Sequence, residues 1–279
     1  GIEIALDPSK MRALADLWSR QPAFSVQGPP GTGKTTLIKA FAAQLFGSDP
    51  SAQILISAHS HHTVDDVRRK ISGLFAGQDP KTRPIILRLG AQEPTEHDSA
   101  ALTHGAVQDL ASSDLVARAP AVLRKKVEAM ASPEAAHKPQ IVEELRILQN
   151  LVQEAANVTL ATSNSGELAG LASRGRRFDW SLIEEAGKAH GFDMAAALQA
   201  SHRLVLIGDH KQLPPYNSKT FKDLLGDPVR VRNAVQVGAQ FAPGLVDPTL
   251  VDDGDDPQVF FDRCQRWRLM VTFFGDFFE

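Results

Sequence analysis

The sequence predicts an α/β protein in which helices cover both faces of a parallel sheet. Short apolar runs alternate with segments of helical periodicity along most of the chain, the order of elements expected for a parallel sheet. The runs are apolar throughout, as expected for strands that are buried on both faces. A glycine-rich loop follows the first run, and a helical pattern follows that loop.

Six apolar runs are predicted to be strands. The first covers residues 24–26, and apolar residues then recur at helical spacing up to Gly47, which we interpret as the helix stop. That helical stripe consists of Leu37, Ile38, Phe41, Ala42 and Leu45. The other strands are predicted at residues 53–57, 84–89, 158–162, 180–184 and 203–207.

Composition limits the class of protein. With 279 residues, 43% of them hydrophobic, the chain can bury a real core. The net charge of −3 means that any nucleic-acid contact must come from a local patch. Cys264 is the single cysteine, which excludes an internal disulfide and fits a core thiol in a reducing cytosol. No apolar run approaches the ~18 residues of a membrane span, so we expect a cytoplasmic protein without a membrane partner.

Two regions depart from the alternating pattern. Residues 91–156 are polar and Ala-rich, and are predicted to form a helical, stalk-like insertion. Its apolar stripe is expected to pack within the chain, which is the commoner use, and the alternative is contact with a partner. The stripe is Ile141, Leu145, Leu148 and Val152. The nucleotide domain is then predicted at residues 1–90 and 157–225, leaving 226–279 unassigned. The acidic stretch 246–257 lacks the spacing of a calcium loop and is predicted to be solvated, whereas the Phe-rich end fits either an unfinished domain or a docking surface.

The loop at residues 28–35 reads GPPGTGKT, which is a phosphate-binding pattern. Its glycines let backbone N–H groups close around phosphate oxygens, Lys34 reaches the β- and γ-phosphates, and the Thr35 hydroxyl ligates Mg²⁺. Chance could produce the four fixed positions, but strand, loop and helix occur in the order that the motif requires. The predicted nucleotide-binding residues are Gly28, Pro30, Gly31, Thr32, Gly33, Lys34, Thr35 and Thr36.

Two carboxylates end the predicted strand at residues 180–184. Parallel sheets gather their sites at the carboxyl ends of strands. We expect Glu184 to hold the Mg²⁺ shell and Glu185 to polarise the attacking water, as hydrolysis requires. The alternative is an acidic pair that begins a surface helix.

The next strand leads into GDHKQLPP at residues 208–215, and here the resemblance to a family becomes specific. The chain resembles superfamily 1 helicases, in the branch of the nonsense-mediated-decay helicase and its bacterial relatives. GPPGTGKT is similar to their motif I, Ile183-Glu184-Glu185-Ala186 to motif II and GDHKQLPP to motif III. The resemblance implies a RecA-like ATPase that uses ATP and Mg²⁺, with Lys34, Glu184, Glu185 and Gln212 as catalytic residues. It also implies that Gln212 senses the γ-phosphate and that Asp209 supports Mg²⁺ or the water network.

Weaker matches lie between these motifs. Residues 58–65 are similar to motif Ia and residues 161–163 to the strand-end Thr motif, which implies nucleic-acid contacts from Ser60, His61, Thr162 and Ser163. His59 and His61 stand where relatives carry Pro and Asn. Residues 6–10 resemble the adenine-reading segment, but Lys10 replaces its Gln. An ammonium only donates hydrogen bonds, so base selectivity is open at this position.

The resemblance covers residues 6–216 and leaves motifs IV, V and VI unmatched. Relatives place their arginine fingers in a second RecA-like domain, so we expect a fragment or a truncated paralogue in which 226–279 begins that domain. The implied partners are single-stranded DNA or RNA and a second RecA-like domain, in this chain or another. The function implied is the ATPase half of a nucleic-acid-dependent helicase or translocase moving 5′ to 3′. The alternative is a nucleotide-dependent binding or regulatory module with little or no unwinding activity.

Overall fold

The computed structural model describes residues 2–79, 81–89, 110–112, 114–117, 119–132, 152–242, 244, 246–251 and 256–278. Its centre is a six-stranded sheet in the order β1-β6-β5-β2-β4-β3, with every ladder parallel. The strands are β1 (Ala23–Gln27), β2 (Ile54–Ala58), β3 (Ile86–Arg88), β4 (Val158–Thr162), β5 (Trp180–Glu184) and β6 (Leu204–Gly208). All six predicted strands are therefore present; β4 and β5 have the predicted ends, and the ends of the other four differ by one or two residues.

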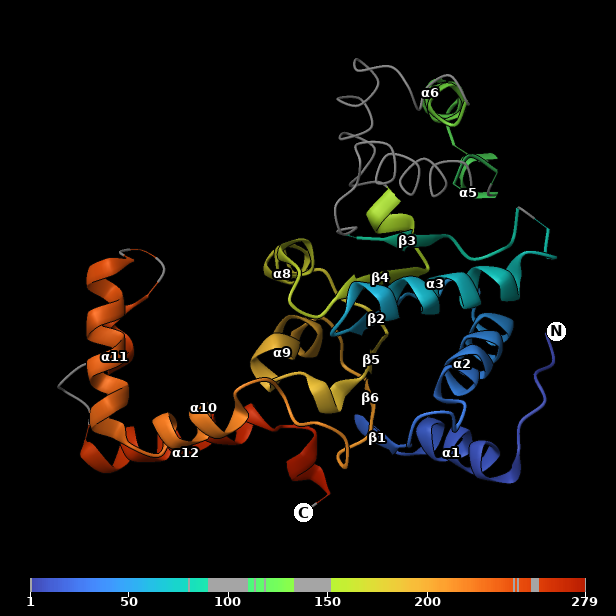
Figure 1. Ribbon diagram of the computed structural model, residues 1–279. Helices are drawn as coiled ribbons and strands as arrows, with labels where there is room; N and C mark the ends of the chain where they lie inside the picture. The colour runs from blue at the N-terminus through green and yellow to red at the C-terminus, as the bar shows by residue number, and fades with distance from the viewer. Residues whose placement is uncertain are drawn as a thin grey trace.

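Helices surround this sheet (Figure 1). The α-helices are α1 (Pro8–Ser19), α2 (Lys34–Ser48), α3 (His61–Phe75), α5 (Asp114–Ala117), α6 (Ala121–Met130), α8 (Gly166–Ser173), α9 (Gly191–Gln199), α10 (Ser218–Leu225), α11 (Pro228–Phe241) and α12 (Pro257–Val271). Short 3₁₀ turns are η2 (Ala186–Lys188), η3 (Pro248–Val251) and η4 (Gly275–Phe277). Within the described residues, no helix has the length and apolarity needed to cross a membrane.

Two hydrophobic cores lie on opposite faces of the sheet. Along β6, Val205 and Ile207 pack with α1, α2 and α3, whereas Leu206 packs with α8 and α9. Neighbouring residues of a strand point to opposite faces, so a strand apolar at every position supplies both cores. The predicted α/β fold, with a parallel sheet and helices on both faces, is confirmed.

The helix after the glycine-rich loop ends slightly later than the sequence suggests. Gly47 was the expected stop, but α2 continues to Ser48 and its C-cap is Asp49, whose N–H bonds to the Leu45 carbonyl. A side chain at Gly47 would meet no atom within 4 Å, so the helix passes through this glycine without a steric need for it. The helix therefore ends one residue after the predicted stop at Gly47.

The described part of the insertion is helical and packs on the α8–α9 face. Val116 of α5 and Val127 and Met130 of α6 are buried in that core. Of the predicted stripe, Val152 is buried there too, while Ile141, Leu145 and Leu148 lie outside the described residues. The domain boundaries at 91–156 stay a prediction.

Helices α10, α11 and α12 and the turn η3 form a helical arm beside the sheet, in which α11 stands farthest from the strands (Figure 1). The arm has a small core of its own, made by Val231, Val251, Phe260 and Cys264. Its end returns to the α/β body, because Phe274 is buried in the same core as α8 and α9. Assignment of residues 226–279 to the start of a second RecA-like domain stays a prediction.

Candidate nucleotide site

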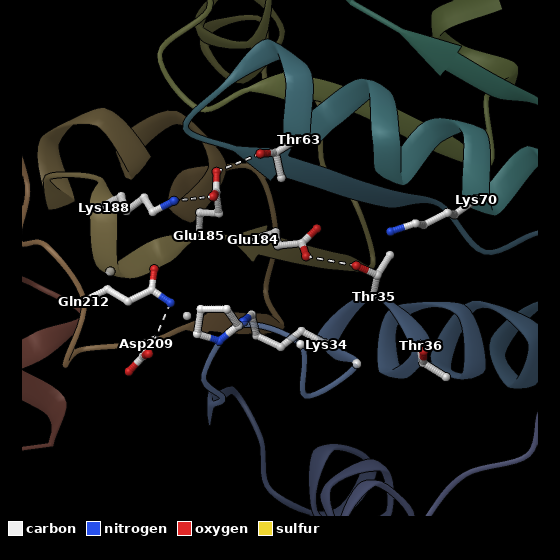
Figure 2. Close-up of a pocket in the computed structure, with 15 residues that line it drawn as sticks. Lys34, Thr35, Thr36, Thr63, Lys70, Glu184, Glu185, Lys188, Asp209 and Gln212 are labelled. Carbon is white, nitrogen blue, oxygen red and sulfur yellow. Dashed lines mark hydrogen bonds and ion pairs between the residues drawn. The ribbon is translucent and has the colours of Figure 1, made fainter.

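A cavity of about 420 Å³ opens at the carboxyl edge of the sheet, where β1, β5 and β6 end (Figure 2). The parallel register sets Gln27 beside Gly208, and Glu184 beside both Ala58 and Ile207. Segments more than 150 residues apart in the chain therefore meet at one place. The lining residues are Pro30, Gly31, Gly33, Lys34, Thr35, Thr36, Thr63, Lys70, Glu184, Glu185, Gly187, Lys188, Gly208, Asp209 and Gln212.

The glycine-rich loop joins β1 to the first turn of α2. Gly31 and Gly33 both have φ of 80°, in the left-handed region that side chains disfavour. Lys34 begins the helix, and its Nζ donates to the carbonyl oxygens of Gly28 at 2.7 Å and Pro29 at 3.1 Å. The ammonium is thus held over the mouth of the loop, where backbone N–H groups and a helix N-terminus favour anions.

Thr35 and Glu184 form a pair at the base of the cavity. The Thr35 hydroxyl donates to Glu184 Oε1 at 3.3 Å, while Glu184 Oε2 is buried without a hydrogen-bond partner among the described residues. Burial raises the pKa of the Glu184 carboxyl, and the bond from Thr35 opposes that rise only in part. A buried carboxylate oxygen with no partner, next to a hydroxyl, suits a hard divalent cation such as Mg²⁺.

Glu185 lies beyond the end of β5 and points the other way, toward α3 and η2 (Figure 2). Its Oε2 accepts a bond of 2.8 Å from the Thr63 hydroxyl, and its Oε1 pairs with Lys188 Nζ at 2.6 Å. Burial favours a higher pKa for Glu185, but the bonds from Lys188 and Thr63 outweigh it and hold the pKa below its usual value. The backbone φ of Glu185 is 57°, which is unusual for a residue with a side chain.

Asp209 and Gln212 lie on the loop after β6. Gln212 Nε2 donates to Asp209 Oδ2 at 3.2 Å, and Gln27 Nε2 donates to Oδ1 at 2.5 Å. Burial alone would raise the pKa of Asp209, yet the bonds from Gln27, from the Lys211 N–H and from Gln212 lower it. Gln212 is therefore oriented by an ionised carboxylate beside the cavity.

The remaining predicted nucleotide residues surround this centre. Pro30 and Thr36 line the cavity, and the Thr32 hydroxyl donates to the Pro29 carbonyl at 2.8 Å, which closes the loop. Lys10, on α1, forms an ion pair with Asp7 and lies over Gly33, where an added Cβ would come within 2.7 Å of Lys10 Cε. Lys10 thus flanks the loop, outside the residues that line the cavity.

Comparison with protein families identifies this arrangement. A family model described as an AAA domain (AAA_11) matches residues 5–146 and 118–219, overlapping ranges that together exceed half of the chain. The chain belongs to this family. With the helicase relatives below, the match makes this AAA domain the first RecA-like domain of a superfamily 1 helicase type, an ATPase-type domain.

Three proteins to which the AAA domain is similar are named as DNA-binding proteins or helicases. DNA-binding protein SMUBP-2 of Mesocricetus auratus is 28% identical over 231 residues, covering 76% of this chain and 22% of the relative. The ATP-dependent helicase/nuclease dna2 of Schizosaccharomyces pombe is 25% identical, covering 78% and 12% respectively. DNA polymerase alpha-associated DNA helicase A of Saccharomyces cerevisiae is 26% identical, covering 68% and 30%. The chain spans less than a third of each of these relatives.

The four residues predicted to contact nucleic acid lie at the same edge of the AAA domain. Ser60 is the N-cap of α3, and His61 Nδ1 lies 2.9 Å from Nη2 of the buried Arg88. Thr162 ends β4 and Ser163 follows it, and the two residues are only 3% and 2% exposed. Their side chains are covered by protein, so Ser60 and His61 are the accessible members, and the assignment of all four stays a prediction.

Sequence reasoning missed Thr63, Lys70 and Lys188 as cavity residues. Thr63 and Lys70 are seven residues apart on α3, a spacing that places both on one helix face, and this signal was available in the sequence. Lys188 is three residues after Glu185 in a 3₁₀ turn, where residues i and i+3 align. Gln27 was also missed, because its contact with Asp209 depends on the pairing of β1 with β6.

Proposed function

We propose that this chain binds Mg²⁺–ATP and hydrolyses it as the ATPase half of a nucleic-acid-dependent helicase or translocase. The observation that carries the proposal is the convergence of Lys34, Thr35 and both glutamates on one cavity. A cation, a hydroxyl beside a buried carboxylate, and a second carboxylate are the groups that phosphoryl transfer to water requires. The motif resemblance supports 5′-to-3′ movement, and the buried single Cys264 fits a reducing cytoplasm.

Different residues of the chain would perform different parts of ATP hydrolysis. The loop N–H groups and Lys34 hold the phosphates of ATP, which lowers the cost of the charge that develops on them. Glu185 accepts a proton from the attacking water, and Gln212, oriented by Asp209, contacts the terminal phosphate and water. Thr35 and Glu184 would hold a magnesium ion, whose charge neutralises phosphate oxygens when it is bound.

Nucleic-acid dependence rests on the relatives and on the position of Ser60 and His61. SMUBP-2 is named a DNA-binding protein, and dna2 is named for DNA replication. We propose single-stranded DNA or RNA as the ligand, and a second RecA-like domain, in this chain or another, as the partner that completes the ATPase.

A regulatory module with slow turnover is the second candidate, favoured by the lack of any arginine among the described residues that line the cavity.

Substitution of each glutamate by glutamine tests the proposal. Glu185→Gln keeps the shape but cannot take a proton from water, so turnover should fall by roughly 100-fold or more while ATP affinity is kept. Glu167→Gln, at an exposed glutamate in α8, is the matched control and should leave turnover unchanged. If Glu184→Gln stops turnover and Glu185→Gln does not, the two roles are reversed.

A further inference from the structure

A chain of hydrogen bonds connects the start of α3 with Glu185. The Thr63 N–H donates to Ser60 Oγ at 3.2 Å, Ser60 Oγ lies 2.8 Å from Thr63 Oγ1, and the Thr63 hydroxyl donates to Glu185 Oε2 at 2.8 Å. The same serine that caps α3 therefore contacts the threonine that holds the proposed base. Figure 2 shows Thr63 above Glu185, opposite Lys188.

The number of available protons determines which group donates and which accepts in each of these hydrogen bonds. An ionised carboxylate only accepts, so the single Thr63 hydroxyl proton points at Glu185. Thr63 Oγ1 can then only accept from Ser60, whose own proton is committed to it. A linear relay results, in which Ser60 donates to Thr63 and Thr63 donates to Glu185.

The rest of α3's first turn is fixed by a buried arginine. Arg88 Nε bonds to Asp65 Oδ1 at 2.9 Å and Arg88 Nη2 lies 2.9 Å from His61 Nδ1. Arg88 comes from β3, so the sheet itself positions the turn that carries Thr63. Each oxygen of Glu185 accepts from a protein donor, Thr63 on one and Lys188 on the other.

We propose that Thr63 is a positioning residue that restrains Glu185, and that Ser60 makes this restraint sensitive to a phosphate of bound nucleic acid. The inference rests on the proposed role of Glu185 as the base. While Thr63 and Lys188 donate to Glu185, its carboxylate is held toward α3 and is a weaker base toward water. A phosphate oxygen beside Ser60 competes for the one Ser60 proton, and loss of that bond weakens the next one, because linked hydrogen bonds polarise one another. Nucleic acid would thereby release the base.

Four proteins separate the relay from ordinary packing: wild type, Thr63→Val, Thr63→Ser and Thr249→Val. Valine has the shape of threonine without the hydroxyl, and serine restores the hydroxyl. Thr249 is the matched control, because its hydroxyl also donates to a carboxylate, Asp247 Oδ1 at 2.7 Å, in the helical arm. The rate of ATP hydrolysis is measured with and without a saturating single-stranded dT20 oligonucleotide, and kcat and KM are fitted separately.

Thr63→Val should raise the basal kcat about tenfold, the size expected for loss of one hydrogen bond to a charged group, with KM for ATP unchanged. The oligonucleotide should then add little, because the restraint is already gone. Thr63→Ser and Thr249→Val should behave as wild type. Ser60→Ala should raise the basal kcat part of the way toward Thr63→Val and lose most of the stimulation, because the bond that nucleic acid would break is already absent. Ser165→Ala, which removes the equivalent N-cap of α8, should change neither.

The relay is overturned if Thr63→Val leaves the basal kcat unchanged or lowers it while Thr63→Ser matches wild type. It is also overturned if the oligonucleotide binds, as followed by fluorescence anisotropy, without changing kcat of the wild type. The Glu185→Gln background distinguishes this failure from failure of the proposed function. Normal turnover in Glu185→Gln removes the base itself, whereas slow turnover that Thr63→Val still raises removes only the relay.

Discussion

Replacing Lys34 by alanine should weaken ATP binding without unfolding the domain. A charge-assisted hydrogen bond is worth about 1.5–3 kcal/mol, so loss of one phosphate contact should weaken the affinity roughly 10- to 150-fold. The stability cost is smaller, because the partners of Lys34 are the carbonyls of Gly28 and Pro29 in its own loop. Loss of these two bonds costs about 0.5–1.5 kcal/mol each, and water partly replaces them. The two hydrophobic cores should therefore stay intact.

Equilibrium titration with a fluorescent ATP analogue in the presence of Mg²⁺ measures this change, and circular dichroism checks the fold. Lys39→Ala is the matched control, since Lys39 lies on the same helix and is not among the residues that line the cavity. Both variants change the net charge equally, so a purely long-range electrostatic effect would appear in both. Unchanged affinity in a folded Lys34→Ala protein would remove Lys34 from the phosphate site.

Three further outcomes follow from the structure. In Gly187→Ala the added Cβ would lie 2.8 Å from the Asp209 carbonyl oxygen. Turnover should therefore fall, and the free energy of unfolding should decrease by about 1–3 kcal/mol. Gly73→Ala, in open space on α3, should not destabilise. Burial raises the pKa of the Cys264 thiol, so a thiol reagent should label it slowly in the native protein at pH 7 and completely after denaturation; rapid native labelling would contradict its packing. Because no arginine lines the cavity within the described residues, the chain should hydrolyse ATP slowly, and a partner that supplies an arginine finger should accelerate it ~10³-fold or more; fast hydrolysis in isolation would refute this.

The strands and the phosphate loop were predictable because their signals are local. A buried parallel strand is a short apolar run, and the loop has a fixed order of residue types. Strand ends were less accurate: β3 begins at Ile86, two residues after Pro84, since proline cannot donate to a ladder. Strand order was not predictable, because β1 pairs with β6 across some 180 residues and no local pattern encodes that choice.

The same limit explains which site residues were missed. Motif residues such as Lys34 and Glu184 are recognisable by their neighbours in sequence. Thr63 and Gln27 contact partners 122 and 182 residues away, Glu185 and Asp209. These contacts form only when β1, β2, β5 and β6 end at one edge of the sheet. Roles that depend on a distant partner need the strand order first.

The adjacent glutamates show how two identical side chains take different tasks. Glu184 is the last residue of β5, so its side chain follows the strand's alternation into the base of the cavity beside Thr35. Glu185 leaves the strand in a left-handed conformation, which turns its carboxylate away from Glu184 and toward Thr63. The environment of Glu184 is desolvated, and its buried Oε2 has no hydrogen-bond partner among the described residues, which suits a cation. The environment of Glu185 supplies two donors, Thr63 and Lys188, which in our proposal restrain the base until the Thr63 bond is weakened. A single backbone dihedral thus separates the proposed metal ligand from the proposed base, and it brings the base within reach of the helix that carries the predicted nucleic-acid contacts.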